Sequence, residues 1–217
     1  MGDKPLTVIS VLRSGGAYDA GWVGKLKRGF ERHLSVPHRF VCLSDCEVPC
    51  ERIALVHDWQ GWWAKLELFR PDVVRGPTLF CDLDNVLVGN VDRLAHFPHE
   101  FAMCRNLWDV SKASSTLMWF ANEAPSKVYE TFLGSPQEIM REYGKGGYGG
   151  VSIGDQGFIW DVMDRKVPFL TDDAQGVIRS YRRHCLVGIP QGCSVVAFGG
   201  EQKPNNQRQP WLEEHWQ

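Results

Sequence analysis

Short apolar runs alternate with amphipathic stretches through the first half of the chain, a pattern that predicts strands separated by helices. The runs are rich in β-branched and aromatic residues and occupy 6–12, 38–43, 53–56 and 78–81. Apolar residues recur at helical spacing from Val23 to Leu34, behind Asp19 as the expected N-cap. A second helix is expected over 62–69, because Pro71 would end it. Elements in this order predict an α/β fold with a mixed, mostly parallel sheet flanked by helices.

The second half of the chain is less regular. Strands are expected at 115–120 and at 194–198. A capping box that starts at Ser135 predicts a helix directly behind it. The segment 144–154 holds six glycines, which fits either a mobile loop or close backbone approach to a ligand, or a plain flexible connection. No repeat or linker divides the chain, so we expect one domain over residues 1–217.

Composition and charge narrow the function classes. The chain has 24 Lys and Arg against 26 Asp and Glu, a net charge of −2, which argues against nucleic acid as a partner. No apolar run is long enough for a transmembrane segment and no leader precedes the first strand, so we expect a cytoplasmic protein with its seven cysteines reduced. Cys42, Cys46 and Cys50 lack a fourth ligand nearby, and no metal site is expected there. The nine tryptophans either fill the core or line a carbohydrate surface.

Two carboxylates stand directly after the apolar run 78–81. Asp82 and Asp84 are two residues apart, so in an extended segment their side chains project to the same side. Paired carboxylates repel each other unless a proton or a cation joins them. Mg²⁺ and Mn²⁺ are commonly held by such groups, with substrate phosphates as further ligands. The D-x-D pattern therefore favours a metal–diphosphate site over a simple acidic turn.

Other polar segments follow the predicted strands. In parallel sheets, ligands bind beyond the carboxyl ends of the strands. Segments 13–18, 44–45 and 82–85 all come directly after predicted strands, so they should meet at the same edge of the sheet. One shared site is expected at that edge.

The D-x-D segment also resembles a known family. Residues 80–91, with the sequence FCDLDNVLVGNV, look like the D-x-D segment of family-8-like glycosyltransferases of the GT-A fold. Other segments resemble motifs of that family in the same order: 8–12 with Tyr18, Ser44-Asp45, 63–66, 114–118, 154–157 and an F-x-G-x-x-K-P ending at 198–204. The resemblance covers about residues 6–205. It implies a GT-A-type fold with a nucleotide-binding part at about 1–90 and a part for donor sugar and acceptor at about 91–217.

The resemblance implies a reaction and a role for each matching residue. A sugar would pass, with retention, from a nucleoside-diphosphate sugar to an unknown glycan or small-molecule acceptor, with UDP as the expected nucleotide. Asp82 and Asp84 would hold Mn²⁺ or Mg²⁺, while Asp155 and Gln156 would lie at the reacting face of the donor sugar as the catalytic pair. The expected substrate-binding residues are Arg13, Tyr18, Asp45, Lys65, Asn85, Ser115 and Lys203.

Several of these residues also have a simpler interpretation. Asp155 could cap the helix after the glycine-rich segment. Lys65 could be a solvated helix residue, and Asn85 could be a turn residue. Tyr18 could be ordinary loop surface. These alternatives stay open on the sequence.

One motif departs from the family pattern. The family usually carries a His metal ligand within the last motif, but positions 197, 199 and 200 hold Ala, Gly and Gly. The metal would then have fewer protein ligands or use another residue, such as His215. Lys203 would carry more of the diphosphate stabilisation, because its compact charge suits a phosphate oxygen.

Two other classes of protein compete with the glycosyltransferase. The segment 80–88 also resembles the nucleophile motif of haloacid-dehalogenase-like phosphatases, in which Asp82 would attack phosphorus and Asp84 would act as general acid. Asp155 with Asp161 would then imitate that family's late acidic motif. A non-catalytic sugar-binding module would explain the tryptophans but not the acidic pair.

Overall fold

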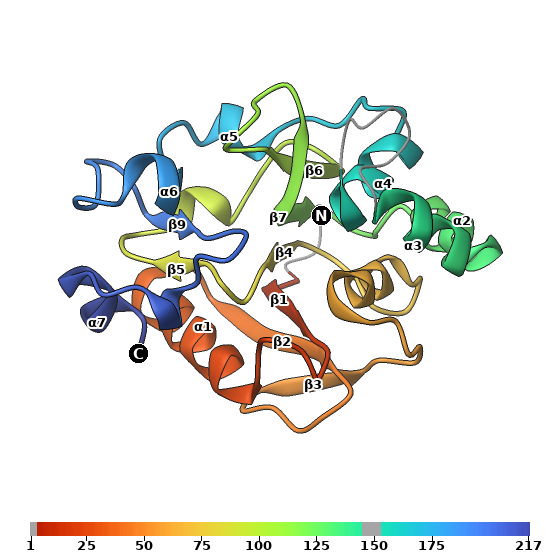
Figure 1. Cartoon of the computed structure of the whole chain (residues 1–217), viewed down its shortest axis with the longest axis horizontal. Helices are drawn as coiled ribbons and strands as arrows, with labels where there is room; N and C mark the ends of the chain where they lie inside the picture. Colours follow the sequence, from red (N-terminus) through yellow and green to blue (C-terminus); the bar gives the residue numbers. More distant parts are fainter. Residues whose placement is uncertain (1–3, 145–152) are drawn as a thin grey trace.

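The structure is a computed structural model that describes residues 4–144 and 153–217. Most of the glycine-rich segment 144–154 therefore lies outside the described residues. A six-stranded sheet with strand order β3-β2-β1-β4-β7-β6 forms the centre of the molecule (Figure 1). Its strands are β1 Leu6–Leu12, β2 His38–Ser44, β3 Glu51–Ala54, β4 Thr78–Cys81, β6 Phe101–Arg105 and β7 Ala113–Phe120.

The strand directions confirm the expected fold class. The four neighbouring strands β3, β2, β1 and β4 are parallel. Strand β7 runs antiparallel to both β4 and β6, which makes the sheet mixed. The carboxyl ends of β1, β2 and β4 therefore lie at one edge, where the sequence predicted a shared site.

Helices cover both faces of the sheet. They are α1 Ala20–His33, α2 Lys127–Gly134, α3 Pro136–Tyr143, α4 Gly154–Val162, α5 Leu170–Asp173, α6 Tyr181–His184 and α7 Pro210–His215, with 3-10 helices η1 Gly61–Phe69, η2 Asp92–Leu94 and η4 Pro204–Asn206. Side chains alternate between the two faces along each strand. Val8 packs in one core cluster with Phe30 of α1, whereas its neighbour Ile9 packs in the opposite cluster with Phe69 of η1.

A second, smaller sheet joins distant parts of the chain. It has the order β5-β9-β8, formed by Val86–Leu87, Val195–Ala197 and Ile178–Ser180. Val86 pairs with Val196, so the strand that follows the D-x-D segment is hydrogen-bonded to a strand near the C-terminus. This pairing brings the motif at 198–204 beside Asp82 and Asp84.

Local predictions had mixed outcomes. The Asp19 cap is confirmed, because its carboxylate accepts a hydrogen bond of 2.8 Å from the Gly21 amide. The capping box at Ser135 is wrong: the helix is present, but the Ser135 side chain makes no capping bond, and its backbone also ends helix α2. No helix among the described residues is both long enough and apolar enough to cross a membrane.

Candidate active site

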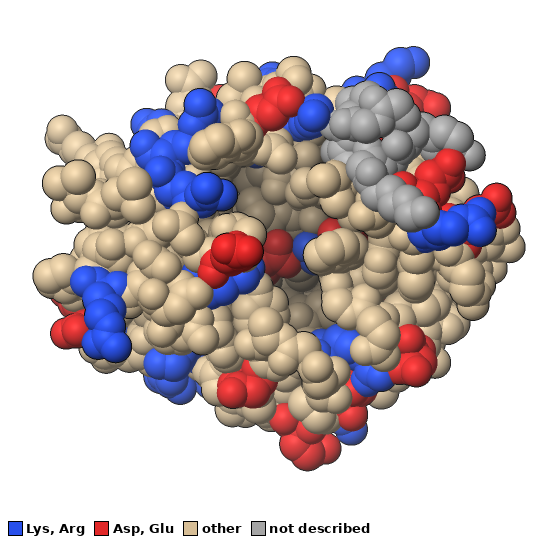
Figure 2. Space-filling view, viewed as in Figure 1, with Lys and Arg blue, Asp and Glu red and all other residues tan. Residues whose placement is uncertain are grey.

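A pocket of about 730 Å³ opens at the carboxyl ends of β1 and β4. It is the hollow near the centre of the space-filling view (Figure 2). Every residue that the sequence placed in the site lines this pocket except Asp45 and Asn85. The lining therefore includes Arg13, Tyr18, Lys65, Asp82, Asp84, Ser115, Asp155, Gln156 and Lys203. The volume lies within the range of small-molecule sites.

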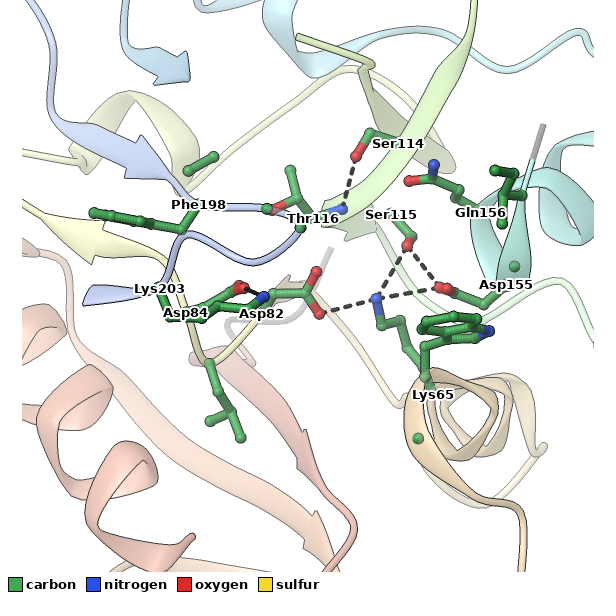
Figure 3. Close-up of a pocket in the computed structure, with 18 of the residues that line it drawn as sticks. Lys65, Asp82, Asp84, Ser114, Ser115, Thr116, Asp155, Gln156, Phe198 and Lys203 are labelled. Atoms are coloured by element: carbon green, nitrogen blue, oxygen red, sulfur yellow. Dashed lines mark hydrogen bonds and ion pairs between the residues drawn. The ribbon is translucent and has the colours of Figure 1, made fainter. Parts of the chain in front are cut away.

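The D-x-D segment forms a tight turn at the end of β4. The Asp82 amide donates to the Thr116 carbonyl of β7 at 2.9 Å, and the Asn85 amide donates to the Asp82 carbonyl at 3.2 Å. Leu83 is only 3% exposed and packs in the core. Because Leu83 points inward, Asp82 and Asp84 on either side of it face the pocket (Figure 3).

Lys65 links two of the carboxylates. Its ammonium nitrogen lies 2.9 Å from Asp82 Oδ1 and 3.1 Å from Asp155 Oδ2. It also donates to Ser115 Oγ at 3.0 Å, and Ser115 Oγ donates to Asp155 Oδ2 at 2.6 Å (Figure 3). Lys65 is 7% exposed, so it is not a solvated helix residue.

Asp155 and Gln156 lie at the start of helix α4. The N-cap of this helix is Ile153, so Asp155 occupies its first turn and not the capping position that the sequence also allowed. Its carboxylate instead bonds to Lys65 and Ser115. Gln156 lines the pocket beside it. The helix thus places both side chains opposite the D-x-D segment.

A second lysine neutralises Asp84. Lys203 Nζ lies 2.6 Å from Asp84 Oδ2, although the two residues are 119 positions apart in the chain. The Tyr18 hydroxyl donates to the same oxygen at 2.9 Å. In the described structure each D-x-D carboxylate is therefore paired with its own lysine, Asp82 with Lys65 and Asp84 with Lys203.

Burial and charge shift the pKa values of these groups. Burial raises the pKa of Asp82 to about 7, Lys65 opposes this rise, and Asp84 adds to it. Burial alone would lower the pKa of Lys65, but Asp155 and Asp82 together raise it, so the ammonium stays charged. Burial and the neighbouring Asp84 raise the pKa of Tyr18, which keeps its hydroxyl protonated as a donor. The positively charged Lys65 thus lies against Asp82, the carboxylate whose pKa burial raises.

Two predicted residues stand outside the pocket lining. Asp45 accepts hydrogen bonds from the Ser14 amide at 2.8 Å and from the Ser14 hydroxyl at 2.5 Å, and it forms an ion pair with Arg13. Asp45 thus holds the loop after β1 in place. Asn85 is 1% exposed and bonds to the Thr116 carbonyl at 3.1 Å, so the structure places it as a buried turn residue and not in contact with the pocket.

Two carboxylates, those of Asp82 and Asp84, are the candidate metal ligands. Among the described residues, no group of three or more His, Cys, Asp and Glu side chains is arranged to hold a metal ion. His215 is not the substitute ligand: it lies against His33, with ring centroids 5.7 Å apart, and does not line the pocket. The hard oxygens of Asp82 and Asp84 do suit Mg²⁺ or Mn²⁺, provided that substrate oxygens supply further ligands.

The structure adds residues that the sequence did not single out. Trp62, Trp108 and Arg182 all line the pocket. The two tryptophans are 52% and 62% exposed, respectively. The only signal in the sequence was the high tryptophan content, because exposed positions follow no hydrophobic period.

These elements define a fold of the GT-A type: a mixed sheet with a D-x-D turn at the carboxyl end of strand β4. No protein-family model and no curated protein matches the sequence. Solved structures do match, and they include glycosyltransferases of this fold.

Three of these structures illustrate the likeness. The apo form of the glycosyltransferase GlyE from Streptococcus pneumoniae TIGR4 superposes with a TM-score of 0.61 at 14% identity over 97% of this chain. The galactosyltransferase LgtC, in complex with donor and acceptor sugar analogs, gives 0.59 at 9% identity, covering 91% of this chain and 88% of LgtC. The bifunctional glycosyltransferase WbbM gives 0.59 at 14% identity over 98% of this chain.

The matched proteins differ in length from this chain. The chain spans 60% of GlyE and 51% of WbbM. At identities of 9–14%, the likeness establishes the fold. The chemistry must be argued from the pocket itself.

Proposed function

We propose that the protein is a glycosyltransferase that moves a sugar from a nucleoside-diphosphate sugar, with UDP as the nucleotide, to an acceptor hydroxyl. The observation that carries this proposal is the junction of Asp84 and Lys203 at 2.6 Å, within a pocket at the carboxyl end of β4. A carboxylate pair beside a lysine, on a GT-A fold, suits a group that is both anionic and able to bind a cation. A diphosphate has both properties.

Stabilisation of the leaving group is the main task of this site. When the bond between the anomeric carbon and the diphosphate oxygen breaks, the electron pair stays on that oxygen and adds negative charge. The Lys203 ammonium supplies a fixed positive charge at this point. Mg²⁺ or Mn²⁺, held by Asp82 and Asp84, would supply further charge as a Lewis acid when bound. Because the protein offers two carboxylates, each already paired with a lysine, we expect the cation to bind mainly together with the diphosphate.

Lys65 and Ser115 position the Asp155 carboxylate, which lies opposite the leaving diphosphate. They fix the Asp155 carboxylate through contacts of 3.1 and 2.6 Å. An acidic group held in this way can bond to sugar hydroxyls or stabilise positive charge that develops at the anomeric carbon. Gln156, in the same helical turn, can donate to the sugar. With retention, the acceptor oxygen forms its new bond on the face from which the diphosphate leaves, and the acceptor proton passes to the departing diphosphate oxygen.

The nucleotide is proposed to bind beside the loop after β1. Tyr18 and Arg13 line the pocket there. Arg13 forms ion pairs with both Asp45 and Asp58, which fixes the loop relative to β2. A rigid loop with an aromatic ring is suited to hold a base and ribose.

The phosphatase alternative is less consistent with the arrangement of acidic residues. Asp161, which would complete a late acidic motif, accepts hydrogen bonds from Tyr143 at 2.9 Å and from Arg165 at 2.6 Å. Asp161 does not line the pocket. The glycosyltransferase assignment requires no role for Asp161.

A thermal-shift screen of nucleotides tests the proposal. A ligand that binds only the folded protein raises its Tm by mass action. We expect UDP or another nucleoside diphosphate to raise Tm, and to raise it further with Mn²⁺ present. A lack of shift with every nucleotide, together with hydrolysis of a generic phosphate ester, would instead support the phosphatase.

A further inference from the structure

One side of the pocket mouth carries an exposed tryptophan on a hydrogen-bonded turn. The turn spans 106–112, where the Asn106 carboxamide oxygen accepts hydrogen bonds from the Trp108 amide at 2.8 Å and the Asp109 amide at 3.0 Å. Arg183 donates to the Trp108 carbonyl at 2.9 Å, which ties the turn to helix α6. The Trp108 side chain is nevertheless 62% exposed. The fold thus holds an aromatic ring at the mouth of the pocket without covering it.

Arg182 lies next to this ring with its donors unused. Its guanidinium carbon is 5.3 Å from the centroid of a Trp108 ring. Arg182 lines the pocket, and no hydrogen bond or ion pair joins its side chain to any other described residue. Figure 2 shows that basic side chains gather beside the hollow in the region of α6. A guanidinium has five N–H donors suited to a carboxylate or phosphate.

The space between Arg182 and the floor of the pocket is lined by glycine. A Cβ atom built on Gly200 would lie 3.9 Å from Arg182 Nη1, and one on Gly199 would have no atom within 4 Å. Larger residues at these positions would narrow the passage from the rim toward Lys203. A ligand can therefore extend from the floor to the rim on this side.

A second exposed ring lies across the pocket, near Asp155. Trp62 is 52% exposed, and its Nε1 would be 3.0 Å from a Cβ built on Gly154. Gly154 has φ +70°, a conformation that suits glycine. The Trp62 ring therefore packs directly over the residue before Asp155, at the place where the proposed reaction would occur.

On the basis of the proposed glycosyltransferase function, we propose that Trp108 and Arg182, with Trp62 opposite, form the acceptor subsite, and that the acceptor is a saccharide bearing an acidic group. Exposed indole rings offer apolar faces to the C–H side of a sugar ring, and Arg182 binds the carboxylate or phosphate.

The charges in the pocket favour this orientation of the acceptor. Asp82, Asp84 and Asp155 line the pocket, and its two lysines are already paired with them, so a second anionic group beside the donor diphosphate would be repelled. At the rim, Arg182 and its neighbour Arg183 attract such a group. An acidic acceptor is thus directed to place its charge at Arg182 and its free hydroxyl toward Asp155.

A glycan-array measurement tests the proposal. The array would present neutral oligosaccharides beside counterparts that carry a uronate, sialate or phosphate group, and the protein would be applied with UDP and Mn²⁺. We expect the acidic members to bind better than their neutral counterparts. Arg182→Gln should weaken binding of the acidic members about tenfold, as expected for loss of a charged hydrogen bond, and should barely affect neutral ones. Trp108→Ala should weaken both.

Controls separate this role from others. Arg75→Gln removes an equal exposed charge at the opposite end of β4, and it should leave the array pattern unchanged. UDP affinity, measured by calorimetry without acceptor, should differ less than twofold between Arg182→Gln and wild type. A tenfold loss of UDP affinity in Arg182→Gln would overturn the proposal by assigning Arg182 to the donor diphosphate. An array on which acidic members bind no better than neutral ones, or on which nothing binds, would also overturn it. If UDP still binds in that case, the proposed function stands without the acceptor assignment.

Discussion

Replacing Lys65 by methionine should destabilise the protein through the carboxylates that it leaves behind. Methionine has a similar length and no charge, so the change removes the ion pairs to Asp82 and Asp155 with little change in packing. Removing one partner of a buried ion pair costs about 3–5 kcal/mol. Asp155 is 5% exposed, but the Asp82 side chain is 28% exposed, and water screens part of that charge. We therefore expect a loss of about 3 kcal/mol in the free energy of unfolding.

Urea denaturation followed by tryptophan fluorescence measures this loss directly. Domains of this kind have unfolding free energies of about 5–15 kcal/mol, so the Lys65→Met variant should still fold. The double variant Lys65→Met with Asp155→Asn also removes one of the unpaired charges and should recover at least about 1 kcal/mol of the loss. Lys166→Met alters an exposed lysine and should change stability by less than about 0.5 kcal/mol. The reasoning is refuted if Lys65→Met loses less than about 1 kcal/mol, or if the double variant is no more stable than the single one.

Three further predictions concern the same pocket. Asp84→Asn should leave the fold intact but abolish the gain in UDP affinity that Mn²⁺ gives, which calorimetry with and without Mn²⁺ will show; an unchanged gain would contradict the metal assignment. Lys203→Ala should lower turnover about 10²-fold by removing one preorganised positive charge. Steady-state kinetics checks this, and wild-type values would mean that Lys203 pairs with Asp84 without acting on the diphosphate. Gly154→Ala should cost about 1–2 kcal/mol in unfolding free energy, because its φ is +70° and the new Cβ would lie 3.0 Å from Trp62. Gly134→Ala, which meets no atom within 4 Å, is the control, and equal stability of the two variants would contradict the strain argument.

The sequence predicted those features that depend on neighbouring residues. The strand at 78–81 was predicted with its observed bounds, because a short apolar run followed by acidic residues has few alternatives. The Asp19 cap follows from local hydrogen bonding in the same way. Burial of Lys65 could not be predicted from its helix alone, since every residue from Trp63 to Phe69 is buried and no polar face marks the orientation.

Contacts between residues far apart in the sequence were harder to predict. Strands β5 and β8 have two or three residues each, too short for a periodic signal. A strand was expected at 194–198, where β9 lies, but the pattern could not show that β9 pairs with β5 and so brings Lys203 to Asp84. The resemblance to a family motif implied that Lys203 and Asp84 serve the same diphosphate, but it did not predict that they contact each other. Trp108 and Arg182, which we propose as part of the acceptor subsite, were missed because both are exposed, and exposed residues do not contribute to the hydrophobic pattern. Asn85 was expected among the substrate-binding residues because it follows the D-x-D pair. The structure instead buries it within the turn, as the simpler interpretation allowed.

The most direct test of the central claim is release of UDP from UDP-glucose and UDP-galactose, followed by mass spectrometry with Mn²⁺ present. Many transferases pass the sugar slowly to water when no acceptor is available, so a donor that fits the pocket should release UDP. Wild type is expected to release UDP from at least one of these donors or another nucleotide sugar, and Asp84→Asn should release it at least about 10²-fold more slowly. Equal release by both proteins, or no release from any nucleotide sugar alongside hydrolysis of p-nitrophenyl phosphate, would contradict the assignment of this pocket to glycosyl transfer.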